Sequence, residues 1–169
     1  MNIIEILFDF IEDPITYSFV FFIYVVLAAV ILPIPVEIGL FNPYIHSALL
    51  IAILALGKGL GAFIVYHIGL RLRKGIKKRF KGGIITKKIV TCCENFVKKY
   101  GYIGLFIIMS IPLMIDSASL YLFSLLNAKR KNGKRSMILS RFILINIGAG
   151  VLRGSIVILI SYYIGIKLI

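Results

Sequence analysis

The segment Leu32–Gly39, with the sequence LPIPVEIG, sets the architecture of this chain, together with Asn42-Pro43 just after it. Three prolines in 11 residues exclude a continuous helix here, because proline lacks a backbone N–H and clashes with the preceding turn. The segment nevertheless stays apolar, and the carboxylate of Glu37 stands among Val, Ile and Leu. A broken apolar segment of this kind predicts a re-entrant hairpin at membrane depth, covered by protein or by a water-filled cavity.

The composition around this segment is that of a membrane protein. Of the 169 residues, 60% are hydrophobic and 16% are charged, and the mean hydropathy is +0.99. Soluble proteins are about 45–50% apolar and about 25% charged. Apolar runs cover 15–32, 44–70, 101–128 and 136–165, and a helix needs about 20 such residues to cross a bilayer. A soluble enzyme, a disordered chain and a secreted disulfide scaffold are therefore excluded.

The two halves of the chain resemble each other. Each has a proline-broken apolar segment in which an acid follows a proline by four positions: Pro33 and Glu37, then Pro112 and Asp116. Each continues into a long apolar helix with two glycines at the G-xxx-G spacing: Gly57 and Gly61, then Gly150 and Gly154. This spacing favours close contact between helices in membranes. The pattern predicts an internal repeat.

The basic residues indicate how the repeats are oriented. The net charge is +13, and the positive charges are concentrated in 71–99 and 129–135, which favours cytoplasmic loops beside anionic lipid over nucleic-acid binding. With both clusters in the cytoplasm, 101–128 begins and ends inside as a hairpin, while 44–70 and 136–165 cross the membrane. The first broken segment then begins and ends outside. The halves become inverted repeats, an arrangement that places a transporter's site near the midplane.

We therefore predict an all-α integral membrane protein, an inverted repeat of re-entrant helical hairpin plus transmembrane helix, located as a multi-pass protein in the cell membrane. A single membrane domain is expected over 1–169. Residues 1–70 form the first repeat, which begins with an N-terminal interfacial helix. Residues 71–99 form a basic cytoplasmic linker, expected as two short amphipathic pieces. Residues 100–169 form the second repeat.

Charged residues inside the apolar runs are the candidate substrate- and proton-binding residues: Glu37, Asp116, Lys58, Arg153 and Arg141. A carboxylate at membrane depth is costly and usually faces a cavity or a partner. Glu37 and Asp116 then act as proton carriers or counter-ions, or else as polar plugs in broken backbone. We expect Asp116 to pair with Arg153 or Lys58, and favour Arg153 because it belongs to the same repeat. Arg141 lies only about 8 Å from the start of its helix, so a functional role and snorkelling to headgroups both stay open.

The sequence contains no metal-spaced His/Cys cluster, no Walker A motif and no nucleophile elbow. We therefore predict no cofactor, no metal and no enzyme activity. Cys92 and Cys93 are expected to be reduced cytoplasmic thiols. The expected partners are membrane lipids, including anionic lipid at the basic loops, and no nucleic acid; whether the protein forms a homo-oligomer stays open.

Several short motifs follow one another along the chain. They are PIPVE at 33–37, a Gly-rich helix ending Tyr66-x-x-Gly69, Lys99-Tyr100-Gly101 with Pro112, and Arg141-Phe142 with Asn146-x-Gly148-Ala149. In this order they resemble the DedA/VTT family, which includes bacterial DedA membrane proteins and the endoplasmic-reticulum scramblases of eukaryotes. The resemblance implies two re-entrant hairpins and lipid translocation, often with proton dependence, and Glu37 matches the family's acid in the first hairpin. The arginines that the family carries around the second hairpin fall on Met109 and Ile115.

The function we expect from these observations is that of a lipid flippase or scramblase. As the resemblance implies, its cargo is a phospholipid or a polyprenyl-phosphate lipid. One alternative is a proton- or ion-coupled exporter of a small solute, and another is a membrane scaffold that transports nothing. A lipid route opens sideways to the bilayer, a solute route is closed to lipid, and a scaffold tolerates the loss of both acids.

Overall fold

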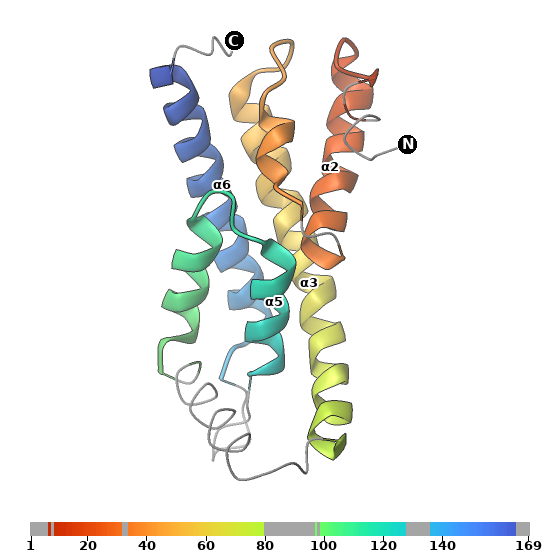
Figure 1. Ribbon diagram of the computed structural model, residues 1–169, viewed down its shortest axis with the longest axis vertical. Coiled ribbons are helices and arrows are strands. Elements are labelled where there is room, and N and C mark those ends of the chain that lie inside the picture. The colour runs from red at the N-terminus through yellow and green to blue at the C-terminus, as the bar shows by residue number, and fades with distance from the viewer. Residues whose placement is uncertain are drawn as a thin grey trace.

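The computed structural model describes residues 7, 9–31, 34–79, 97, 99–127 and 136–164. The fold of these residues is all-α (Figure 1). In chain order these residues form α2 Pro14–Val30, the short 3-10 helix η1 Val36–Leu40, α3 Ser47–Arg79, α5 Asp116–Leu125 and α6 Leu139–Ile164. Residues 99–110, which precede α5, are helical as well.

The two longest helices, α3 and α6, lie side by side and run in opposite directions (Figure 1). Their 33 and 26 residues correspond to about 50 Å and about 39 Å. Within them, Ser47–Arg73 and Leu139–Ile164 are long and apolar enough to be candidate membrane spans. A Cβ on Gly150 would lie 3.0 Å from Cα of Ala55, so the two helix backbones approach closely where the glycines permit it. The predicted contact at the G-xxx-G spacing is confirmed for α6.

The helix α3 is longer than the sequence pattern predicted. It continues beyond residue 70 as far as Arg79, so residues 71–79 of the expected linker are a continuation of α3. The physical reason is that lysine and arginine are good helix formers and that no proline interrupts this stretch. The rest of the linker up to residue 96 and the basic cluster at 129–135 lie outside the described residues, as does most of the predicted N-terminal helix.

The other elements form two hairpins of about half the length of the molecule (Figure 1). The first consists of α2, which runs from one end to the middle, and residues 34–46, which return to the same end. The second consists of residues 99–110 and α5, and it enters from the opposite end. The tips of the two hairpins therefore meet near the middle of the molecule, beside α3 and α6.

The first hairpin is held together by α2. The hydroxyl of Tyr17 donates to the carbonyl of Gly39 over 3.0 Å, and that of Tyr24 donates to the carbonyl of Pro35 over 2.9 Å. Gly39 lies so close to the ring of Phe21 that a Cβ would be 2.1 Å from Cε2. These contacts fix η1, and with it Glu37, against α2.

The second hairpin is fixed at its outer end, where α5 stops. The amide of Asn127 donates to the carbonyl of Met137 over 2.8 Å, and its oxygen accepts the Met137 N–H over 2.8 Å. The Tyr66 hydroxyl of α3 donates to the same Met137 carbonyl over 2.8 Å. These bonds tie the end of α5 to α3 and to the start of α6, while the tip of the hairpin extends to the middle of the molecule.

Candidate functional site

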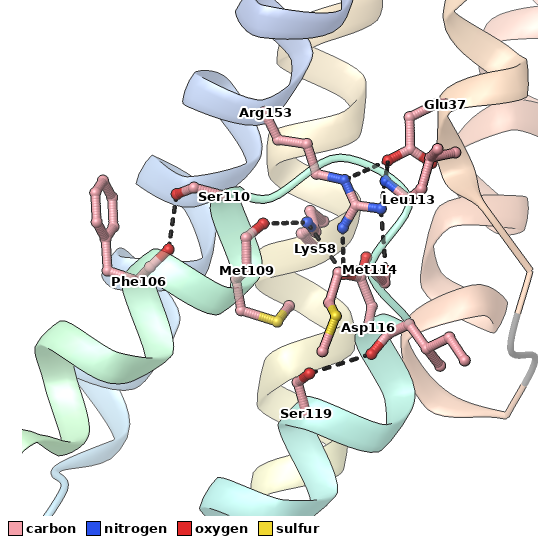
Figure 2. A network of polar contacts seen from close by, with 11 residues as sticks. Glu37, Lys58, Phe106, Met109, Ser110, Leu113, Met114, Asp116, Ser119 and Arg153 are labelled. Carbon is pink, nitrogen blue, oxygen red and sulfur yellow. Dashed lines mark hydrogen bonds and ion pairs between the residues drawn. The ribbon is translucent and has the colours of Figure 1, made fainter.

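Arg153 is the centre of a buried cluster of charges at the meeting point of the two hairpins (Figure 2). Its side chain is 0% exposed. Its Nε donates to Oε1 of Glu37 over 2.5 Å, and its Nη2 contacts the same oxygen. Its Nη1 donates to Oδ1 of Asp116 over 2.6 Å. One guanidinium therefore binds the acids of both hairpins.

Lys58 completes the cluster from α3. It is 0% exposed, and its Nζ lies 3.3 Å from Oδ1 of Asp116, the oxygen that Arg153 also uses. The same Nζ donates to the carbonyl of Met109 over 3.2 Å. Met109 lies in the last turn of the helical residues 99–110, where carbonyls lack an intrahelical partner. Lys58 thus binds the acid of the second hairpin and also the end of the helix that leads to its tip.

Backbone groups of the second tip also join the cluster. The N–H of Leu113 donates to Oε1 of Glu37 over 2.8 Å, and Nη2 of Arg153 donates to the carbonyl of Met114 over 3.1 Å. Leu113 has φ 63°, a left-handed conformation that is uncommon for a residue other than glycine. The sequence pattern missed these two positions because their contribution is made by the backbone.

The formal charges of the cluster cancel. Two carboxylates, on Glu37 and Asp116, face two cations, on Lys58 and Arg153, as buried charges require. Each carboxylate makes its contacts through one oxygen. Among the described residues, Oε2 of Glu37 and Oδ2 of Asp116 are buried and have no hydrogen-bond partner. Each acid therefore keeps one oxygen that is able to accept a hydrogen bond from a ligand.

The structure brings together four of the five predicted site residues, and Arg141 is the exception. The pairing of Asp116 with Arg153 that the repeat predicted is present, and Lys58 shares the same carboxylate oxygen. Arg141 is exposed, and its Cζ lies 5.9 Å from the ring centre of Tyr102. It is about 18 Å from Arg153 along α6. Arg141 therefore contributes no contact to the cluster.

The surface around the cluster carries many large apolar side chains. Large hydrophobic side chains are exposed on the helices that surround it, including Leu56, Leu60, Phe63, Ile103, Phe106, Ile107, Leu144, Val151 and Leu152. By contrast, the four charged residues of the cluster are at most 4% exposed. The charges are thus enclosed within the protein, and the described exterior is suited to an apolar environment.

The chain matches no protein-family model, no curated protein and no solved structure. The chemistry of the site follows from its own residues. They are two buried acids and two buried cations, with one bare oxygen on each acid.

Proposed function

We propose that this chain is an integral membrane protein that moves lipid from one leaflet of the bilayer to the other. In this proposal α3 and α6 cross the membrane, the two hairpins are re-entrant, and the two halves are inverted repeats. The observation that carries the proposal is the charge cluster around Arg153, which lies where hairpins from opposite ends meet. Transporters built from inverted repeats bind their substrate at such a place.

The distribution of apolar and basic residues supports a membrane location. The end of α3, the end of α5 and the start of α6 lie at the same end of the molecule (Figure 1). The basic segments 71–99 and 129–135 are connected to that end, so one cytoplasmic side accounts for both. Broken backbone at membrane depth must be covered by protein, and the cluster provides partners for the second tip.

The chemistry of the cluster favours an anionic headgroup as the substrate. A phosphate binds strongly to a guanidinium and an ammonium that lie together, as those of Arg153 and Lys58 do. In binding, it competes with Glu37 and Asp116 for these cations. A headgroup that binds these cations leaves the two carboxylates without their partners. The motifs that resemble the DedA/VTT family favour the same function.

Reconstitution into liposomes that contain a fluorescent anionic phospholipid tests this proposal. Wild-type protein should make the labelled lipid of the inner leaflet accessible to a membrane-impermeant quencher. Lys58→Met should lose most of this activity, since it removes a cation of the cluster. Arg141→Ala is the matched control, because it removes an exposed cation outside the cluster, and it should retain activity.

Two results would count against lipid movement. If wild-type protein leaves the lipid in place but releases a charged solute trapped in the liposomes, the solute-exporter alternative replaces it. If Glu37→Gln combined with Asp116→Asn leaves the activity unchanged in a folded protein, the cluster takes no part in transport and the scaffold alternative is favoured.

A further inference from the structure

The helix η1 of the first hairpin and the tip of the second hairpin are covered very differently. In η1, Val36 and Leu40 are 1% and 0% exposed, and two tyrosines of α2 hold the helix in place. In the second, the tip loop of residues 111–115 carries large apolar side chains that are exposed: Ile111 49%, Leu113 73%, Met114 40% and Ile115 45%. The tip loop thus has exposed apolar side chains, while its residues Leu113 and Met114 lie beside the charge cluster (Figure 2).

Two polar contacts link the middle of the tip loop to the charge cluster. The N–H of Leu113 binds Glu37, and the carbonyl of Met114 binds Arg153. The other contacts join the ends of the loop to the helices on either side: the N–H of Ile111 bonds to the carbonyl of Ile108, and the carbonyl of Ile115 accepts from the N–H and the hydroxyl of Ser119. The position of the loop therefore depends on the charges of Glu37 and Arg153. A proton on the former, or an anion on the latter, weakens these contacts.

The backbone of the tip loop is strained at Leu113. A φ of 63° brings the Cβ of an L-residue too close to the next carbonyl oxygen, and a glycine would avoid this clash. The side chain of Leu113 is mostly exposed, so packing does not compensate. The hydrogen bond to Glu37 is what holds the strained residue in place. Strain that persists at one loop residue is typical of sites that switch between two states.

We propose that the tip loop opens the charge cluster sideways toward the lipid, and that the strain at Leu113 favours the open form. This inference rests on the proposed lipid function and adds its route, since a lipid keeps its tails in the bilayer while its headgroup enters the protein. Loss of the contacts to Glu37 and Arg153 releases the loop, and relaxation of Leu113 offsets part of the cost of opening.

A comparison of Leu113→Gly with Leu113→Ala measures how the backbone strain at this position affects the opening of the loop. Both variants remove the exposed side chain, but only glycine adopts a positive φ without strain. The probe is dicyclohexylcarbodiimide, an apolar reagent that enters from the bilayer and modifies protonated carboxyl groups. Its reaction with Glu37 and Asp116 in liposomes is followed by mass spectrometry of peptides. We expect about tenfold slower modification in the glycine variant, because the relaxed loop stays closed.

Ile115 provides the matched control. It belongs to the same loop and is also exposed, but its φ is −72°, which alanine adopts without strain. Ile115→Gly and Ile115→Ala should therefore be modified by the carbodiimide at equal rates. Equal rates for the two Leu113 variants would overturn the proposal, and so would the absence of any modification of Glu37 and Asp116 in wild-type protein. If Leu113→Gly is modified more slowly than Leu113→Ala but the wild-type protein moves no labelled lipid, the opening of the loop is supported and the lipid function is overturned.

Discussion

Neutralising Asp116 together with Lys58 should harm the protein less than neutralising Asp116 alone. Asp116→Asn leaves two cations, on Lys58 and Arg153, opposite the single charge of Glu37. Adding Lys58→Met restores equal numbers of charges and keeps the Arg153–Glu37 pair. Arg153→Met is not an equivalent compensating change, because it also removes the guanidinium that Glu37 binds.

The expected size of the effect follows from the geometry. Nζ of Lys58 lies 3.3 Å from Oδ1 of Asp116, which corresponds to about 5 kcal/mol at an effective dielectric constant of about 20. Desolvation cancels part of this attraction. Removing one member of a buried pair costs about 3–5 kcal/mol, and this is the loss expected for Asp116→Asn. We expect a coupling energy between the two positions of at least about 2 kcal/mol, within the range found for residues in contact.

A double-mutant cycle in detergent micelles measures this coupling. The free energy of unfolding is determined for the wild type, the two single variants and the double variant by titration with a denaturing detergent. A second cycle, of Asp116→Asn with Arg141→Ala, is the control, because Arg141 is exposed and lies outside the cluster. A coupling below about 0.5 kcal/mol for Lys58, or equal couplings in both cycles, would refute the paired arrangement.

Three further predictions concern transport, packing and orientation. Glu37→Gln keeps the size of the side chain but binds no proton, so lipid movement in liposomes should lose its pH dependence; an unchanged pH profile contradicts a proton-carrying role. Gly61→Ala would place a Cβ 2.4 Å from the Cβ of Ala29 on α2, so it should destabilise the protein by about 1–3 kcal/mol and lower its melting temperature in detergent. Gly148→Ala is the control and should leave the melting temperature unchanged, because the nearest atom to its new Cβ would be 3.7 Å away. An impermeant maleimide added to intact cells should label Tyr163→Cys and leave the native cysteines of the basic linker unmodified, and the opposite pattern would contradict the inverted topology.

Much of the fold could be predicted because proline and glycine act locally. Three prolines in 33–43 exclude a continuous helix whatever surrounds them, and the structure has a turn, η1 and a return segment there. The glycines of α3 and α6 mark the faces on which helices meet. The end of α3 was not predictable in this way, because basic residues suit both a helix and a cytoplasmic loop. The pattern placed the boundary at residue 70, and the helix continues to Arg79.

The candidate site was predictable to the extent that burial imposes pairing. A carboxylate in an apolar run needs a cation as its partner, and few basic residues lie within the apolar runs of this chain. Arg141 could have been excluded from periodicity alone, because twelve residues at about 100° each turn its side chain about 120° away from the face of Arg153. The contacts of Leu113 and Met114 were not predictable, since they depend on how one hairpin tip meets the other. Nothing in the residue type of Leu113 indicates a positive φ.

The pairing within the cluster couples the two halves of the chain. Glu37 belongs to the N-terminal half and binds Arg153 of the C-terminal half. Asp116 of the C-terminal half is shared between Arg153 and Lys58, and Lys58 belongs to the N-terminal half. Each acid is thus neutralised in part by a cation from the other half, and neither half could keep its charges buried if the halves separated. A ligand that binds Arg153 therefore acts on both hairpin tips at once, because the same guanidinium holds Glu37, Asp116 and the carbonyl of Met114. Displacement of the second tip breaks the contact of Leu113 with Glu37 of η1, so the positions of elements from the two halves depend on each other.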